Sequence, residues 1–352
     1  MNQDELIGFI GTYTKGESEG IYRFILDVKL KEIRDIEVVV HIEDPTYFAI
    51  RHDNQYLYSV AKNNGLGGVV SFLIDTNTKQ LTELNRQMVK GPSPCHVSIN
   101  SKGNRVVAAN YHKGTLQFYM VNRENGILEG ASITYHSGSG PNKERQERPH
   151  VHYAGFAPNE AYVIAVDLGT DQLMTYKEKE GRLTEIQSLS VHPGSGPRHL
   201  VFHPNGNYAY VLTELSSEVI VLTYDKQRGR FQQIQSISAL PKAYGGSNYG
   251  SAIQISSDGE FIYAANRGHN SIAIFRVNQD SGKLTFLEAI STEGNWPRDF
   301  TLDPTEHFII VVNERSNNLI LFSRNKTTGQ LTLVQSNVSV PSPVCVKFLH
   351  KE

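Results

Sequence analysis

The chain of 352 residues has few cysteines, no long apolar run and no excess of charge of either sign. Its two cysteines, Cys95 and Cys345, lie far apart, which excludes the closely spaced cysteine pairs of zinc and redox sites. A chain this poor in cysteine is typical of a reducing compartment. We therefore expect a cytoplasmic protein.

The balance of charge also limits the possible partners. Lys and Arg together number 34, and Asp and Glu number 36, so the sequence predicts neither a nucleic-acid partner nor an anionic membrane partner. No segment has the run of about 18 apolar residues that a transmembrane helix needs. The first residues, MNQDELIGFIGTYT, carry acids but no basic residue before their apolar run, and this does not resemble a signal peptide.

Helical periodicity is also absent, and an internal repeat is found instead. Seven segments begin with a short apolar strand, and the complete ones continue through three further runs rich in Val, Ile, Tyr and Phe, with turn signals between them. The segments begin at Pro45, Pro94, Val151, Pro197, Gly250, Pro297 and Pro343. Four strands in a unit of about 50 residues are typical of a β-propeller blade.

The two ends of the chain predict how the ring closes. The last segment supplies only one strand, 344–349, whereas three strand-like runs precede the first repeat, within residues 6–40. Together they complete one blade, so that no open sheet edge separates the first blade from the last. We therefore predict an all-β, seven-bladed propeller that forms a single domain over residues 1–352.

Ionisable residues gather on one face of this predicted ring. Neighbouring strands of a blade are antiparallel, so the innermost strand begins on the face where the second strand ends. The ionisable residues at these strand starts and strand ends include His96, His152, Arg198, His199, Glu214, Arg267 and Arg298. Two long connections, 136–150 and 240–250, reach the same face, and loops that lengthen on one face of a repeat scaffold are commonly functional.

Arg198 and Glu214 have two possible roles. They can form an ion pair that only stabilises the rim of the ring. They can also form a charged pair in a semi-enclosed pocket, where the carboxylate stays ionised and the guanidinium stabilises an oxyanion. Alternation along an extended strand predicts that Arg198 and its neighbour His199 do not face a substrate in the same way. His199 is therefore either structural or functional.

The remaining candidates also have two interpretations each. His150 and His152 alternate on an extended strand, so both imidazoles lie on one side of it. Because no HExxH motif or cysteine cluster accompanies them, we expect neither a metal nor a cofactor. Instead of binding a metal, one of the two can act as an acid–base group while the other only hydrogen-bonds to a backbone carbonyl. Arg267 and Arg298 are either solvated cations or a bidentate site for a carboxylate or phosphate.

The sequence resembles the seven-bladed lactonase family, which groups bacterial 6-phosphogluconolactonases with fungal carboxymuconate-lactonizing enzymes. The resemblance covers essentially the whole chain and rests on IGTYT, PCHVSIN, RPHVHYAGFAPN, GSGPRHLVFHPNG, YVLTEL and YAANRGHNSI. It implies a catalytic trio that matches His150 in RPH, Arg198 in GPRH and Glu214 in TEL. Since His152 holds the strand position that Arg198 holds in its own blade, the two histidines can exchange roles.

The resemblance implies metal-independent hydrolysis of a sugar lactone, 6-phosphogluconolactone in a bacterium, within the pentose phosphate pathway. In this hypothesis Glu214 or His150 deprotonates a water that attacks the carbonyl, Arg198 stabilises the oxyanion, and the other acid–base group protonates the departing ring oxygen. The expected substrate-binding residues are His96, His152, His199, Arg267 and Arg298.

Two other functions stay open. One is lactonization or isomerisation of an unsaturated dicarboxylate, as in the carboxymuconate branch of the family. The other is a non-enzymatic platform for protein binding, which would present an exposed apolar patch on the rim. The sequence indicates a small anionic lactone as partner under the first hypothesis, and it indicates no particular oligomeric state.

Overall fold

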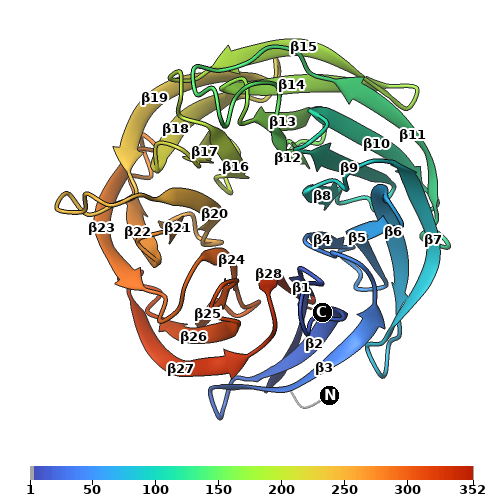
Figure 1. The fold of residues 1–352 in the computed structure, drawn as a ribbon. Coiled ribbons are helices and arrows are strands. Elements are labelled where there is room, and N and C mark those ends of the chain that lie inside the picture. Colours follow the sequence, from blue (N-terminus) through green and yellow to red (C-terminus); the bar gives the residue numbers. More distant parts are fainter. Residues whose placement is uncertain (1–3, 352) are drawn as a thin grey trace.

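The described residues of the computed structural model, 4–351, form 28 β-strands and contain no helix. The strands make seven sheets of four antiparallel strands, arranged as blades around a central axis (Figure 1). The predicted all-β, seven-bladed propeller is therefore confirmed. Among residues 4–351 there is no helix that could cross a bilayer.

The blades follow one another in chain order, apart from the first, which combines both ends of the chain. From the innermost strand outward, blade 1 consists of β28 (Pro343–Phe348), β1 (Glu5–Thr12), β2 (Gly20–Asp27) and β3 (Glu32–His41). Blade 2 consists of β4 (Phe48–Ile50), β5 (Tyr56–Asn63), β6 (Leu66–Ile74) and β7 (Leu81–Lys90). Blade 3 consists of β8 (His96–Ile99), β9 (Arg105–Asn110), β10 (Thr115–Val121) and β11 (Leu128–Tyr135).

The other four blades have the same order. Blade 4 consists of β12 (Val151–Phe156), β13 (Val163–Asp167), β14 (Gln172–Lys179) and β15 (Arg182–Ser190). Blade 5 consists of β16 (Pro197–Phe202), β17 (Tyr208–Thr213), β18 (Glu218–Asp225) and β19 (Arg230–Ser238). Blade 6 consists of β20 (Tyr249–Ile255), β21 (Phe261–Arg267), β22 (Ser271–Val277) and β23 (Leu284–Ser291). Blade 7 consists of β24 (Pro297–Leu302), β25 (Phe308–Asn313), β26 (Asn318–Arg324) and β27 (Leu331–Ser339).

Blade 1 closes the ring by pairing the two ends of the chain. The C-terminal strand β28 lies antiparallel to β1, with Gly8 opposite Phe348 and Ile10 opposite Val346. The predicted strand 344–349 is observed one residue earlier, and its predicted partners within 6–40 are β1, β2 and β3. The predicted closure is thus confirmed.

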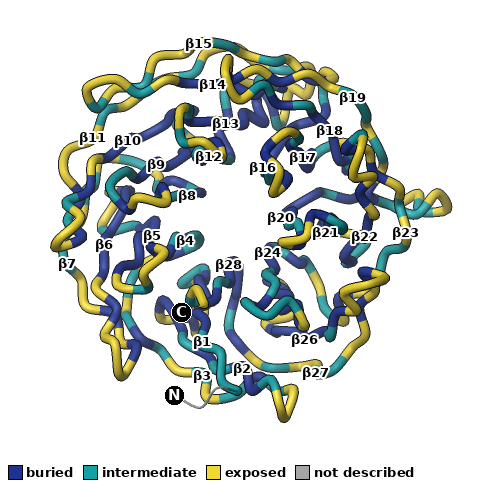
Figure 2. The backbone as a smooth tube through the Cα atoms, turned by 180° about the vertical axis from the view of Figure 1, so that it is seen from behind, coloured by how far each residue is buried: buried dark blue, intermediate teal, exposed yellow. Residues whose placement is uncertain are grey.

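The hydrophobic residues are divided among seven clusters, each between two neighbouring blades. The cluster between blades 7 and 1 contains Phe308 and Ile310 together with Ile10 and Phe24. β25 is the second strand of blade 7, and both of its faces are covered by neighbouring blades. Its sequence is therefore an almost continuous apolar run, FIIVVN. Outer strands expose many of their residues to solvent (Figure 2).

The innermost strand begins on the face where the second strand ends, as predicted from the sequence. Pro197 pairs with Thr213, so Glu214 follows directly where the innermost strand of blade 5 begins. The connection 136–150 lies between β11 and β12, as predicted. The second long connection is shorter than the predicted 240–250, because β20 already begins at Tyr249.

A β-bulge interrupts the start of the innermost strand in blades 4, 5 and 7. The pairing skips one residue in each blade, and these residues are His152, Arg198 and Arg298. A bulge bends its strand and redirects the side chain of the extra residue. Strict alternation, on which the sequence analysis relied for Arg198 and His199, therefore does not hold at these positions.

The chain enters four blades through a residue with a left-handed backbone. These residues are Asp44 (φ 48°), Gly196 (φ 59°), Trp296 (φ 70°) and Ser342 (φ 45°). The conformation costs a bulky residue such as Trp296 about 1–3 kcal/mol. The backbone N–H of Trp296 donates to Asn270 Oδ1 at 2.9 Å and so holds this turn in place.

Removal of β28 is expected to open the ring. A chain ending at Ser342 lacks the partner of β1 and uncovers the hydrophobic clusters on both sides of blade 1, so we expect it to aggregate or to lose cooperative unfolding. Thermal unfolding followed by circular dichroism, together with size-exclusion chromatography, measures this. The control is a chain ending at His350, which keeps β28. Equal unfolding temperatures of the two chains would contradict this role of the closure.

Candidate functional site

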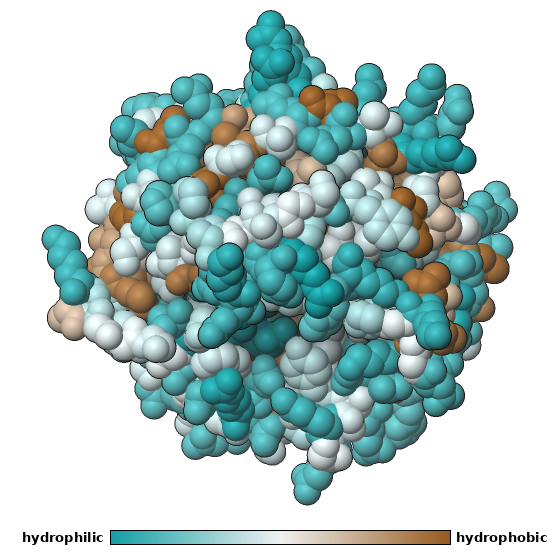
Figure 3. Space-filling model, turned by 45° about the horizontal axis from the view of Figure 1, so that its top comes forward, coloured by the Kyte–Doolittle hydropathy of each residue, from teal (hydrophilic) through white to brown (hydrophobic). Residues whose placement is uncertain are grey.

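A polar cavity of about 520 Å³, called here the strand-start cavity, opens where the innermost strands begin. Tyr13, Tyr249 and Trp296 form its aromatic wall. Its charged lining residues are Lys15, Arg145, Glu214, Arg267, Arg298, Glu314 and Arg315. Five cations face two carboxylates, an excess of three positive charges. Figure 3 shows a hollow near the middle of the molecule, bordered mainly by hydrophilic residues.

Glu214 is the centre of an ionic cluster at this cavity. Its Oε2 atom accepts a hydrogen bond from Arg198 Nε at 3.0 Å and forms an ion pair with Arg267 Nη2 at 2.9 Å. Its Oε1 atom accepts a hydrogen bond from Arg145 Nη2. The carboxylate is only 5% exposed, so three guanidiniums compensate one buried negative charge.

The charges of this cluster are fixed at neutral pH. Burial alone would raise the pKa of Glu214, but Arg267 and Arg198 outweigh it and hold this pKa well below its usual range. Burial and the neighbouring Arg267 lower the pKa of Arg198 to about 9. The carboxylate is therefore ionised and the guanidinium protonated at pH 7, as expected for this pair from the sequence.

Blade 6 fixes two of the guanidiniums through backbone carbonyls. Arg267 Nη2 donates to the carbonyl oxygen of Gly250 at 2.7 Å, and Arg198 Nη1 donates to that of Ser251. Both arginines are at least 95% buried. Their side chains thus have defined positions without any substrate, which is a requirement for electrostatic stabilisation of a transition state.

Arg145 is the cluster residue that the sequence analysis did not single out. It comes from the connection 136–150, and its guanidinium lies 5.6 Å from the centre of the Tyr249 ring. Its side chain is one-third exposed, in contrast to those of Arg198 and Arg267. The length of the connection 136–150 indicated from the sequence that this loop is functional, but it did not indicate which of its residues takes part.

The structure gives His150 and His152 different surroundings. His150 Nδ1 donates to the carbonyl oxygen of Tyr111 at 2.9 Å, and His150 Nε2 lies 3.1 Å from Glu147 Oε2. The His150 imidazole stacks on the Tyr111 ring, with 4.2 Å between the ring centres. His150 is thus held by Tyr111 and Glu147 rather than by the residues of the ionic cluster.

His152 lies closer to the charges of the cluster. Burial and Arg198 lower the pKa of His152 well below 6.5, while Glu214 acts in the opposite direction. The imidazole is therefore neutral at pH 7. Its Nδ1 atom lies 3.9 Å from Cys95 Sγ, and burial raises the pKa of this thiol to about 11, so Cys95 is not a thiolate nucleophile.

The other predicted histidines form a layer beneath the cluster. The His199 ring centre lies 5.3 Å from those of His96 and His152, and His199 Nε2 lies 3.3 Å from Arg198 Nη1. Arg198 and His199 thus both point into the interior of the ring, but only Arg198 contacts Glu214. His96 lines a different cavity, described below.

Of the eight predicted site residues, three line the strand-start cavity: Glu214, Arg267 and Arg298. Arg298 Nη1 lies 3.8 Å from Glu314 Oε2, and Lys15 Nζ lies 3.0 Å from Glu314 Oε1. The structure therefore joins Arg198, Glu214 and Arg267 directly and places Arg298 in a second ion cluster across the cavity.

The chain matches the family model described as "Lactonase, 7-bladed beta-propeller" over residues 7–348. The protein belongs to this family of lactonases. Bacillus subtilis 6-phosphogluconolactonase is 53% identical over 345 residues, which cover 98% of this lactonase and 99% of the relative. The resemblance inferred from the sequence is thereby confirmed.

Two solved structures of similar proteins share the fold over nearly the whole lactonase chain. A putative 6-phosphogluconolactonase from Bacteroides fragilis gives a TM-score of 0.91 at 33% identity and covers 99% of both chains. The periplasmic gluconolactonase PpgL of Pseudomonas aeruginosa gives a TM-score of 0.90 at 30% identity. The match covers 98% of this lactonase and 99% of the PpgL chain.

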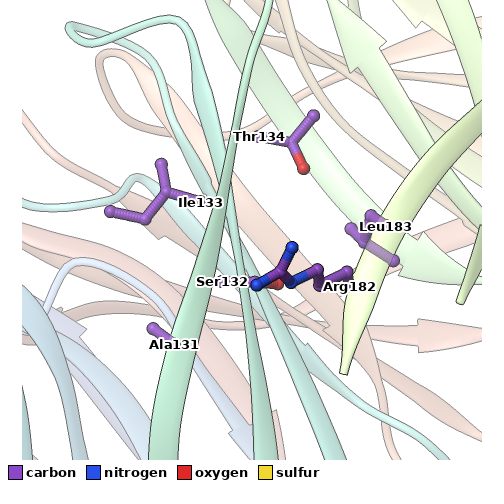
Figure 4. A pocket seen from close by; sticks show the side chains of 6 residues that line it. All are labelled: Ala131, Ser132, Ile133, Thr134, Arg182 and Leu183. Atoms are coloured by element: carbon purple, nitrogen blue, oxygen red, sulfur yellow. The ribbon is translucent and has the colours of Figure 1, made fainter. Parts of the chain in front are cut away.

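A further cavity of about 390 Å³ lies between the outer strands β11 and β15 of the lactonase (Figure 4). Arg182 is its one charged lining residue, and none of the predicted site residues lines it. Among residues 4–351 there is also no group of three or more His, Cys, Asp or Glu side chains arranged to hold a metal ion. The strand-start cavity, which Glu214, Arg267 and Arg298 line, is the candidate active site.

The Glu214→Gln variant is expected to change how the stability of the lactonase depends on pH. The pKa of Glu214 in the folded protein is below its ordinary value of 4.5, so its ionic contribution is complete at neutral pH and declines as the pH falls below 4.5. We expect the wild type to unfold at a higher temperature than the variant at neutral pH, and the difference to shrink in acid.

Thermal unfolding of both proteins across the acid range measures this effect. Glu83→Gln, which breaks an exposed ion pair with Arg86 on β7, is the matched control and should shift stability by only about 0–1 kcal/mol. If the unfolding temperature of the wild type exceeded that of Glu214→Gln by more as the pH falls, the predicted direction of this pH dependence would be wrong.

Proposed function

We propose that this lactonase hydrolyses 6-phosphogluconolactone to 6-phosphogluconate. The observation that carries the proposal is the excess of three positive charges around the strand-start cavity. A phosphate group needs such cations, and arginine binds phosphate in bidentate fashion. The 53% identity to Bacillus subtilis 6-phosphogluconolactonase supports the same substrate. The product is an intermediate of the pentose phosphate pathway, and we place the reaction there and in the cytoplasm.

The phosphate is proposed to bind between Arg145, Arg298 and Arg315. Arg298 and Arg315 approach from blade 7 and the connection after β25, and Arg145 approaches from the opposite connection 136–150. Since Arg145 is the most exposed arginine on Glu214, the phosphate can draw it away from Oε1 of that carboxylate. The lactone ring then gains access to the residues beneath.

We assign the oxyanion-stabilising role to Arg198, with Arg267 beside it. When water attacks the lactone carbonyl, negative charge develops on the carbonyl oxygen, and a fixed guanidinium in a buried site stabilises this charge by about 3–4 kcal/mol. Arg198 is 3% exposed and held by Glu214 and the Ser251 carbonyl, so it needs no reorganisation.

We assign the proton-accepting role to His152 rather than to Glu214 or His150. Glu214 has both oxygens occupied and a very low pKa, which makes it a poor base. His152 is neutral at pH 7, and the nearby Glu214 favours its protonated form. Oxyanion formation offsets the positive charge of Arg198, so His152 becomes more basic as the proton leaves water. The resulting imidazolium then protonates the departing ring oxygen.

The two histidine variants distinguish this assignment from the alternative. His152→Asn is expected to lower kcat by about 10²–10⁴-fold, and His150→Asn by less, because only His152 exchanges the proton. Steady-state kinetics with 6-phosphogluconolactone, on variants shown by circular dichroism to be folded, measures both. A greater loss in His150→Asn would reverse the roles of the two histidines.

The pH profile of the wild type gives a second test of the base. Because the pKa of His152 is well below 6.5, kcat/KM should not fall when the pH decreases from neutral through 6.5. Initial rates corrected for spontaneous hydrolysis of the lactone provide this profile. A decline centred near pH 6.5 would assign the base to a histidine with an ordinary pKa.

Arg145 is expected to determine the preference for a phosphorylated substrate. Arg145→Ala should raise KM for 6-phosphogluconolactone at least tenfold and should leave kcat/KM for unphosphorylated gluconolactone unchanged or higher, because Glu214 is then no longer covered. The matched control is Arg148→Ala, an exposed arginine of the same connection whose side chain is 59% exposed. Equal effects of Arg145→Ala on both lactones would show that Arg145 does not recognise the phosphate. Turnover of muconates in place of lactones by the wild type would overturn the proposed function.

A further inference from the structure

Another cavity opens at the opposite end of the central axis. This cavity, of about 290 Å³, is called the strand-end cavity because Ile50 and Ile99, the last residues of β4 and β8, line it. All innermost strands run in the same direction, so it lies on the face opposite the strand-start cavity. The layer that contains His96 and His199 separates it from the ionic cluster around Glu214.

Lys347 brings to the strand-end cavity an ammonium that has no direct ion pair among the described residues. Within residues 4–351 its ammonium makes one hydrogen bond, to the Tyr47 hydroxyl at 3.3 Å, and has no carboxylate within 4.0 Å. The nearby Asp299 lies beyond that distance and accepts the backbone N–H of Val346 at 3.1 Å. An ammonium carries three donors, so two remain available to a ligand.

His96 supplies another free donor to the same cavity. Its Nδ1 atom accepts the backbone N–H of Ala154 at 3.5 Å, so the proton of the neutral imidazole resides on Nε2. Burial and the charge of Lys347 lower the pKa of His96 well below 6.5, and the ring is therefore neutral at pH 7. No acceptor for Nε2–H is present among the described residues.

Tyr153 adds a hydroxyl that has no hydrogen-bond partner among residues 4–351. The centre of its ring lies 4.6 Å from the centre of the His96 ring, which in turn lies 4.3 Å from the centre of the Tyr47 ring. Gly155 gives this hydroxyl its space, because a Cβ atom at that position would lie 2.3 Å from the Tyr153 oxygen. Free donors from three blades therefore line one small cavity.

We propose that the strand-end cavity binds a small monocarboxylate. The carboxylate matches the single positive charge of Lys347 and accepts hydrogen bonds from His96 and Tyr153. The other walls include the buried side chains of Phe48, Val97 and Phe348, which suit a short alkyl chain. A phosphate fits less well, because it carries more charge than one ammonium compensates and has no alkyl group to cover these walls.

Butyrate, inorganic phosphate and n-butylamine serve as probes for this site on the full-length protein. Isothermal titration calorimetry should show saturable binding of one butyrate per chain and no binding of n-butylamine. Lys347→Met should weaken butyrate binding at least tenfold, and Tyr153→Phe, which removes only the hydroxyl, should weaken it several-fold. Lys102→Met is the matched control, because Lys102 is an exposed lysine just after β8 on the same face, and it should leave binding unchanged.

Each alternative result overturns the proposal. Absence of butyrate binding would contradict the proposed site, and so would equal butyrate affinities of the wild type and Tyr153→Phe. Both results are decisive even if Lys347→Met does not fold. Phosphate that binds more tightly than butyrate, with the same dependence on Tyr153, would replace the monocarboxylate with an inorganic anion. The assay measures binding only, so its outcome is independent of whether 6-phosphogluconolactone is the substrate.

Discussion

The second strand of every blade in this propeller has apolar residues on both faces, and both faces must be covered. A blade therefore needs a neighbour on each side, and only a closed ring gives one to all seven blades. The hydrophobic residues accordingly form seven clusters between blades in place of one central core. The pairing of β28 with β1 completes this arrangement, because it places both chain ends in one sheet.

With the packing needs met between the blades, the central axis is free to hold polar residues. The side chains there are organised by charge: Glu214 alone connects Arg198 of β16, Arg267 of β21 and Arg145 of a long connection. One carboxylate thus links two strands and a long connection. Its removal would leave three repelling guanidiniums, so this residue supports the local structure.

The fold was predictable from the sequence because its determinants are local and repeated. Strand-like runs and turns recur in every blade, and the unequal chain ends leave ring closure as the one arrangement without open edges. The Arg198–Glu214 contact was predictable for the same reason, since antiparallel register brings a strand start and a strand end together. Arg145 was not, because the path of a long connection depends on its tertiary contacts. The bulges at Arg198 and His152 also escaped prediction, since alternation assumes regular pairing.

The closure has a consequence for synthesis of the protein. Lys15 follows the first strand of the chain, yet its partner Glu314 lies in the last complete repeat, and the N–H of Tyr13 donates to the carbonyl oxygen of Ser342. The wall of the strand-start cavity that these early residues form therefore cannot assemble while the ribosome is still translating blade 7. The wall of the strand-start cavity is thus complete only after the last strands have been synthesised.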